Sequence, residues 1–123
     1  MKNAISWFEI PVTDFERAKS FYENIYEVKM EPMEAMGMQS AFFPADLENG
    51  IGGCIIKGDG YEPSAKGGVL VYLNGGDDLN TVLSRIEQAG GKVLLAKTGI
   101  GPHGFMAHFQ DTEGNHLALH SFA

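Results

Sequence analysis

The chain repeats one order of predicted elements, and this internal repeat limits its possible folds more than any other feature. Residues 5–57 and residues 67–122 are each predicted to run strand, helix and three strands. The polar, Gly- and Pro-containing residues 58–66 fit a connector between the two halves. Because each half alone is too small to bury a convincing core, we expect residues 1–123 to form a single domain in which the halves pack together.

The repeat is clearest at the turn before the last strand of each half. Residues 46–50 and residues 111–115 are both acidic, contain Gly and Asn, and lead into an apolar segment. Asp, Asn and Gly favour turns because they bond locally to the backbone or adopt left-handed conformations. Both segments therefore predict a turn that enters a strand.

Composition excludes several classes of partner and site. The chain carries a net charge of -7, from nine basic and sixteen acidic residues, with no run of Lys or Arg. We therefore expect no nucleic-acid and no membrane partner. The sequence moves directly into a strand pattern without an apolar secretory segment, so the expected location is cytoplasmic. Cys54 is the only cysteine, which excludes an internal disulfide and a multi-cysteine zinc site.

The first half opens with a strand followed by a helix. Residues 7–12 alternate, which places different side chains on the two faces of the strand. Thr13 and Glu16 have the spacing of a capping box, in which the hydroxyl accepts from a free backbone amide and the carboxylate reaches back. The following helix can cover the apolar face of the strand, because its apolar residues recur at spacings of three and four. These residues are Phe15, Ala18, Phe21, Tyr22 and Ile25.

The other elements are predicted from short apolar segments bounded by Gly, Pro and polar residues. In the first half, strands are expected at Val28–Met33, Met38–Phe43 and Ile51–Lys57. The second half is expected to begin with a strand at Val69–Leu73. A helix then follows, capped by Asp77 or Asp78 and ended by the Gly pair at 90–91. The apolar stripe of this helix consists of Leu79, Val82, Leu83 and Ile86.

Four segments of the sequence resemble the vicinal oxygen chelate superfamily, which includes glyoxalase I, extradiol dioxygenases, and fosfomycin- and bleomycin-resistance proteins. They are residues 7–14, 17–22, 90–93 and 111–115. The sequence looks closest to small bacterial glyoxalase-related proteins of unassigned reaction. The resemblance implies an α+β fold, in which two tandem βαβββ modules form an open, barrel-like mixed sheet around a pocket. It also implies a homodimer, and a divalent ion in the pocket of metal-dependent members.

The metal-ligand positions implied by this resemblance hold few suitable side chains. The ligand of the first strand corresponds to Trp7, whose indole has no lone pair for a cation. Its counterpart in the second half is at or beside Gly68, and the ligand of the last strand corresponds to Ala118. The fourth position is Gly53 or Cys54, depending on a register shift of one residue. We therefore expect no metal ligands and no cofactor, because one soft thiolate does not hold the ions of this family.

The resemblance nevertheless implies a pocket with polar and aromatic residues on its walls. Strand alternation keeps Glu9 on the face of Trp7, and His116 and His120 on the face of Ala118. Residues 98–106 form a Gly-rich segment that is interpreted either as a lid over the pocket or as a plain connector. Phe43 is an alternative to Phe42 as a stacking surface. The full set of expected ligand-binding residues is Trp7, Glu9, Phe42, Cys54, Tyr72, Met106, His108, Ala118 and His120.

Two functions remain open at this point. In the first, the protein has lost the metal site and binds a small, planar or aromatic molecule, because such pockets are mostly apolar with a few placed polar groups. In the second, it is a glyoxalase-like lyase or isomerase. This enzyme would use Glu9 and His120 as an acid-base pair, or a displaced divalent metal held by Glu9, His120 and His108. Missing ligand residues favour the binding function.

Overall fold

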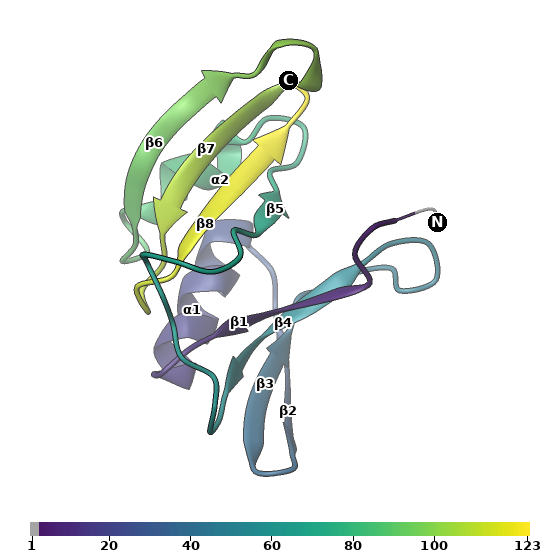
Figure 1. The fold of residues 1–123 in the computed structure, drawn as a ribbon, viewed down its shortest axis with the longest axis vertical. Coiled ribbons are helices and arrows are strands. Elements are labelled where there is room, and N and C mark those ends of the chain that lie inside the picture. The colour runs from purple at the N-terminus through teal and green to yellow at the C-terminus, as the bar shows by residue number, and fades with distance from the viewer. Residues whose placement is uncertain (1–2) are drawn as a thin grey trace.

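The computed structural model describes residues 3–123, whose elements form two modules with the same order (Figure 1). The first module consists of β1 (Trp7–Pro11), α1 (Phe15–Tyr26), β2 (Glu31–Ala35), β3 (Met38–Phe42) and β4 (Gly52–Lys57). The second consists of β5 (Tyr72–Asn74), α2 (Asn80–Ile86), β6 (Lys92–Gly99), the 3₁₀ helix η1 (Gly101–His103), β7 (Phe105–Gln110) and β8 (His116–Ser121). The predicted α+β class and twofold βαβββ order are confirmed.

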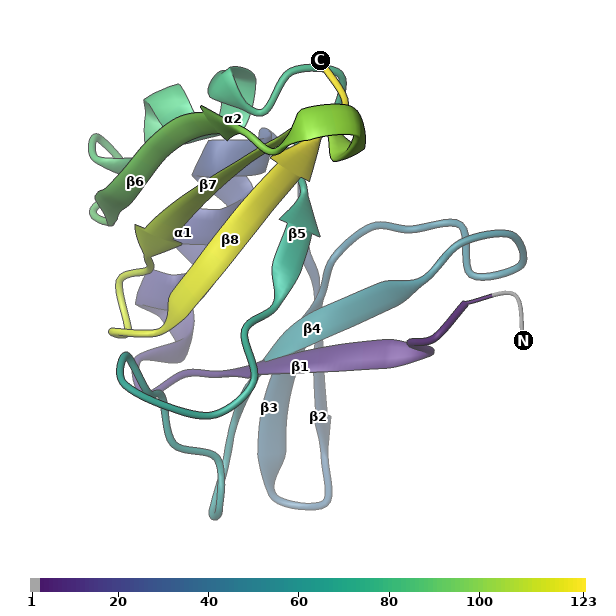
Figure 2. The same ribbon diagram turned by 45° about the horizontal axis from the view of Figure 1, so that its top comes forward.

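Two separate four-stranded sheets are formed, one by each module. Their strand orders are β1-β4-β3-β2 and β5-β8-β7-β6. The first strand of each module pairs in parallel with the last, and the other pairs are antiparallel. Figure 2 shows the two sheets diverging from each other, with β5 the strand of the second sheet nearest to β1 and β4. The sequence resemblance implied one open, barrel-like mixed sheet. Within the described residues, this arrangement is made of two separate open sheets.

The helix α1 buries the apolar stripe predicted from the sequence. All five stripe residues, from Phe15 to Ile25, are buried. The helix lies behind the second sheet as well as against β4 (Figure 1), and the ring of Phe21 is 6.3 Å from that of Phe109 in β7. One core therefore joins the two modules. No helix within residues 3–123 has the length and apolar content needed to cross a bilayer.

The predicted capping box at the start of α1 is wrong in both of its partners. The N-cap is Asp14, whose Oδ1 accepts from the amide of Arg17 at 3.0 Å. The reciprocal carboxylate comes from Glu113 in the β7–β8 turn rather than from Glu16. Glu113 accepts from the amide of Thr13 at 2.9 Å and from the amide of Asp14 at 2.7 Å. A residue of the second module thus caps the helix of the first.

A buried polar cluster around Asp111 strengthens the same junction. Its Oδ2 accepts from the hydroxyl of Tyr22 in α1 at 2.8 Å, and its Oδ1 accepts from the amide of Asn115 at 2.9 Å. The side-chain amide of Asn115 donates to the carbonyl of Pro11 at the end of β1, at 2.7 Å. Burial raises the pKa of Asp111, although these hydrogen bonds oppose the shift. The turn therefore holds β1 and α1 against the second sheet.

Several element boundaries differ from the prediction. β2 begins at Glu31 rather than at Val28, because Glu27 adopts a left-handed conformation (φ 54°) and ends α1. β5 covers only Tyr72–Asn74 rather than Val69–Leu73. In α2 the N-cap is Leu79 rather than an Asp. The side chain of Asp78 nevertheless accepts from the amide of Asn80, the first residue of α2, at 2.9 Å, and the amide of Leu79 donates to the hydroxyl of Ser121 at 3.0 Å. The predicted stripe of α2 is buried.

Candidate functional site

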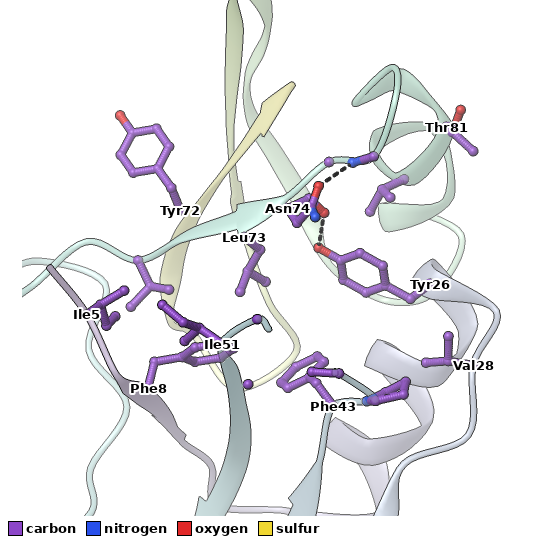
Figure 3. Close-up of a pocket in the computed structure, with 18 of the residues that line it drawn as sticks. Ile5, Phe8, Tyr26, Val28, Phe43, Ile51, Tyr72, Leu73, Asn74 and Thr81 are labelled. Carbon is purple, nitrogen blue, oxygen red and sulfur yellow. Dashed lines mark hydrogen bonds between the residues drawn. The ribbon is translucent and has the colours of Figure 1, made fainter. Parts of the chain in front are cut away.

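A cavity of about 990 Å³ lies between the two modules (Figure 3). Its apolar walls come from both halves of the chain and include Ile5, Phe8, Val28, Phe43, Ile51, Val71, Leu73 and Val82. Its polar edge is formed by the end of β5, the β5–α2 segment and α2, and includes Asn74, Asp77, Asp78, Thr81 and Arg85. The cavity therefore combines a large apolar body with charged groups at one side.

Aromatic rings of the first module form one wall of the cavity. Phe8 on β1 packs against Phe43, with ring centroids 5.6 Å apart, and Phe43 also contacts Tyr26 at 6.3 Å. Phe8 fits only because its neighbour on β4 is Gly53, where an added Cβ would lie 2.4 Å from the ring. A glycine in the adjacent strand thus makes space for the aromatic wall.

Hydrogen bonds connect this wall to the polar edge. The hydroxyl of Tyr26 donates to the backbone carbonyl of Asn74 at 2.9 Å, and Oδ1 of Asn74 accepts from the amide of Gly76 at 2.8 Å (Figure 3). Burial raises the pKa of Tyr26 well above its ordinary value, so its hydroxyl stays protonated and remains a donor. These bonds join α1 of the first module to β5 of the second across the cavity.

The open face of the first sheet carries a second group of residues. The rings of Trp7 and Phe42 meet edge to face at 5.7 Å, and the Cys54 thiol lies 4.0 Å from Oε2 of Glu9. Burial, followed by the charge of Glu9, raises the pKa of Cys54 to about 11, so the thiol is protonated at neutral pH. Interaction with the same carboxylate raises the pKa of Tyr61. This group is polar but holds no activated nucleophile.

Histidines occupy the open face of the second sheet. Nδ1 of His108 on β7 lies 2.8 Å from Nε2 of His116 on β8, and the ring of Tyr72 meets that of His108 edge to face at 6.1 Å. Burial, followed by the charge of His116, lowers the pKa of His108. His120 lies farther along β8, where its Nε2 is 2.7 Å from the carbonyl oxygen of His103 and therefore donates to it.

The structure distributes the nine residues expected at the pocket over both sheets. Trp7, Glu9, Phe42 and Cys54 belong to the first sheet, and Tyr72, Met106, His108, Ala118 and His120 belong to the second. Of the nine, only Tyr72 lines the inter-module cavity. Glu9 and His120, the expected acid-base pair, contact different neighbours, and no hydrogen bond within residues 3–123 joins them. Residues 98–106, expected as a loop or lid, do not line the cavity, and Thr98 and Gly99 belong to β6.

Sequence reasoning missed most of the cavity wall. The sequence pattern places Phe8 on the strand face that the helix covers, gives no role to Tyr26, and offers Phe43 only as an alternative to Phe42. Alternation in β1 does place Phe8 opposite Trp7, but it does not show that a space remains beside Phe8. The small residue Gly53, directly opposite Phe8 in the strand pairing, was the available signal.

The strand register fixes the residues at the metal-ligand positions. Glu9 pairs with Cys54, and Tyr72 pairs with Ala118. The second-half counterpart of Trp7, two residues before Tyr72, is therefore Leu70 rather than Gly68. Cys54, not Gly53, lies on the face of Trp7 and Glu9, because Gly53 faces the ring of Phe8.

The side chains at the four metal-ligand positions do not fit a divalent metal ion. These residues are Trp7, Cys54, Leu70 and Ala118. Indole, leucine and alanine side chains supply no lone pair for a cation, and the remaining thiol is buried and protonated. Within residues 3–123, no group of three or more His, Cys, Asp or Glu side chains has the geometry of a metal site elsewhere.

Sequence comparisons assign the chain to a family. A sequence model of the glyoxalase/bleomycin resistance protein/dioxygenase superfamily matches residues 4–119. A glyoxylase-like domain-containing protein of Didymella fabae is 34% identical to this chain, in an alignment that covers 94% of this chain and 91% of that protein. The chain belongs to the glyoxalase/bleomycin resistance protein/dioxygenase superfamily. The resemblance found in the four sequence segments is thereby confirmed.

Solved structures share the superfamily fold. Glyoxalase I from Zea mays superposes with a TM-score of 0.73 at 21% identity, covering 94% of this chain but only 44% of the maize chain. The chain thus spans less than half the length of that enzyme. The antibiotic binding protein TnmS3 from a Streptomyces strain superposes with a TM-score of 0.65 at 20% identity, over 100% of this chain and 99% of its own. At these identities the likeness concerns the fold.

Proposed function

We propose that this superfamily member binds a small, apolar, planar molecule in the inter-module cavity, without the divalent metal of the family. The cavity itself carries the proposal. Its volume of about 990 Å³ lies near the upper end of the roughly 300–1,000 Å³ typical of small-molecule sites. Three rings, those of Phe8, Phe43 and Tyr26, offer flat surfaces against which a planar molecule can stack.

Binding is favoured over catalysis by the arrangement of the polar groups. The acid-base pair expected for a lyase or isomerase, Glu9 and His120, has separate partners on separate sheets. The thiol of Cys54 is protonated, and the ligand positions offer no metal donors besides it. A cavity with aromatic walls needs none of these groups in order to bind a ligand. The antibiotic binding protein TnmS3 supports the proposal, because a chain of this fold and length has that described function.

The proposal is tested by following energy transfer from Trp7, the only tryptophan, to 1-pyrenemethanol. We expect saturable transfer that a metal chelator does not change. Val71→Phe places a larger side chain in the cavity wall and should weaken binding by tenfold or more, a loss of about 1.4 kcal/mol. Leu94→Phe introduces the same side chain at an exposed position of β6, outside the cavity lining, and is the control that should bind normally. Equal affinities in both variants would place the ligand elsewhere.

We also infer that the protein forms a homodimer. The inference is supported by large apolar side chains that remain exposed on the open faces of the two sheets, among them Trp7, Met33 and Tyr72. β1 and β5 are also edge strands. Light scattering coupled to size exclusion should give twice the mass of one chain, and a monomer mass across the accessible concentration range would overturn the inference.

A further inference from the structure

The charged residues around the inter-module cavity are predominantly acidic. Asp46, Asp77 and Asp78 line it, against a single basic residue, Arg85. Arg85 is already neutralised, because its Nη2 lies 3.3 Å from Oε1 of Glu27 and its Nη1 donates to the carbonyl of Ile25 at 3.0 Å. The cavity edge therefore presents negative charge in a chain whose net charge is -7.

Four backbone amides near the polar edge are already hydrogen-bonded, so they do not offset the negative charge of these carboxylates. The amides of Leu79 and Asn80, at the beginning of α2, are bonded to Ser121 Oγ at 3.0 Å and to Asp78 Oδ1 at 2.9 Å. The preceding amides of Gly75 and Gly76 are likewise bonded, to the carbonyl of His120 and to Asn74 Oδ1. These four amides are thus not available to an anion, which would face the carboxylates of Asp77 and Asp78 at this edge.

Asp77 is the carboxylate best placed to pair with a ligand. Asp46 is engaged by three hydrogen bonds within its own turn, from Glu48 and Asn49. Asp78 is paired with Lys97 at 2.9 Å as well as bonded to Asn80. Asp77 is exposed, and no side-chain hydrogen bond or ion pair within residues 3–123 engages it. It remains available to a positively charged group at the cavity edge.

We propose that the occupant of the cavity is a hydrophobic organic cation. This proposal rests on the proposed function and adds the charge of the ligand. An aromatic or aliphatic body contacts Phe8, Phe43 and Val71 in the apolar part, and an ammonium or amidinium group lies at the acidic edge beside Asp77. Charge complementarity then discriminates among ligands of similar shape, in the way that electrostatics gives specificity at other binding sites.

Three probes with the same ring system test this selectivity, namely 1-pyrenemethylammonium, 1-pyrenemethanol and 1-pyreneacetate. Their affinities are measured by energy transfer from Trp7 at low ionic strength, and again with added salt. We expect the ammonium to bind about tenfold more tightly than the acetate, with the alcohol between them, because solvent weakens but does not abolish the interaction between partly exposed charges. Added salt should reduce the differences in affinity among the three probes, since the acidic edge is open to solvent.

Two variants that each remove one negative charge show where in the structure the preference for the ammonium probe arises. Asp77→Asn should weaken binding of the ammonium about threefold and leave that of the alcohol unchanged. Glu34→Gln removes the same charge from exposed β2, outside the cavity lining, and should leave both affinities unchanged. Equal weakening in the two variants would assign the preference to net charge and overturn the role of the cavity edge.

The outcomes separate this inference from the proposed function. Alcohol and acetate binding as tightly as the ammonium would refute charge selection and leave cavity binding intact. If none of the three probes binds, the proposed function fails together with the inference. Ammonium binding that survives Val71→Phe would show that the probe occupies another surface and would refute both.

Discussion

Neutralising Glu113 should lower the free energy of unfolding of the protein. It should also make that free energy less dependent on pH in the acidic range. Solvent does not reach this side chain, which lies in the turn between β7 and β8. Its Oε1 accepts from the amides of Thr13 and Asp14 at 2.9 and 2.7 Å, and its Oε2 accepts from Nε of Arg17 at 2.8 Å. One carboxylate thus satisfies the beginning of α1 and joins the two modules.

The magnitude follows from the pKa of this group. Burial acts to raise the pKa of Glu113, but hydrogen bonds from Arg17, Asp14 and Thr13 outweigh it and lower the pKa from 4.5 to about 2. A lowered pKa stabilises the folded state above the unfolded value, and this contribution is lost as the pH falls through the folded value. The shift sets an upper limit of about 3 kcal/mol, at about 1.4 kcal/mol per pKa unit. Because Arg17 is half exposed to solvent, we expect about 2 kcal/mol.

Urea unfolding of Glu113→Gln tests this reasoning. The variant should lose about 2 kcal/mol at neutral pH, and its stability should change less than that of the unsubstituted protein between about pH 5 and pH 2. Glu16→Gln is the matched control, because Glu16 has the capping-box spacing but lies exposed in the first turn of α1. It should change stability by no more than about 0.5 kcal/mol. Equal losses in the two variants would refute the capping of α1 by Glu113.

Three further substitutions or reactions test other parts of the structure. Tyr22→Phe should cost about 1–3 kcal/mol in chemical unfolding, because it removes a buried donor from Asp111; an unchanged midpoint would contradict the polar cluster. Gly53→Ala should destabilise the protein by about 1–3 kcal/mol and weaken pyrenemethanol binding, because the added Cβ displaces the ring of Phe8. The Cys54 thiol should react with a disulfide reagent only after unfolding, because it is buried and its pKa is about 11; rapid labelling of the folded protein would show that the site is open.

The sequence predicted those features that arise from local periodicity. The stripe of α1, from Phe15 to Ile25, is buried as expected, because helical spacing determines which residues share a face. In β7, Ala107 and Phe109 likewise share the buried face, because side chains two residues apart in a strand point to the same side. These patterns need only residues that are near one another in the chain, so the twofold order of elements could be predicted with them.

Features that join distant residues could not be predicted in the same way. The carboxylate that caps α1 is Glu113, 99 residues after Asp14, whereas a capping-box pattern considers only the nearby Glu16. Likewise, the position equivalent to Trp7 is Leu70, which only the pairing of Tyr72 with Ala118 reveals. The cavity was missed because apolar periodicity shows that residues face inward, and not whether their neighbours fill the space.

Chemical shifts of ¹³C-labelled methyl groups, followed during titration with 1-pyrenemethanol in the presence of a metal chelator, test the central claim most directly. Methyl groups of Val28, Ile51 and Leu73 line the inter-module cavity, whereas Met33 and Ala118 lie outside it on β2 and β8. The account predicts saturable shifts confined to the cavity methyl groups. Shifts at Met33 and Ala118 with an unchanged cavity would contradict it, and would place the ligand on the open faces of the sheets.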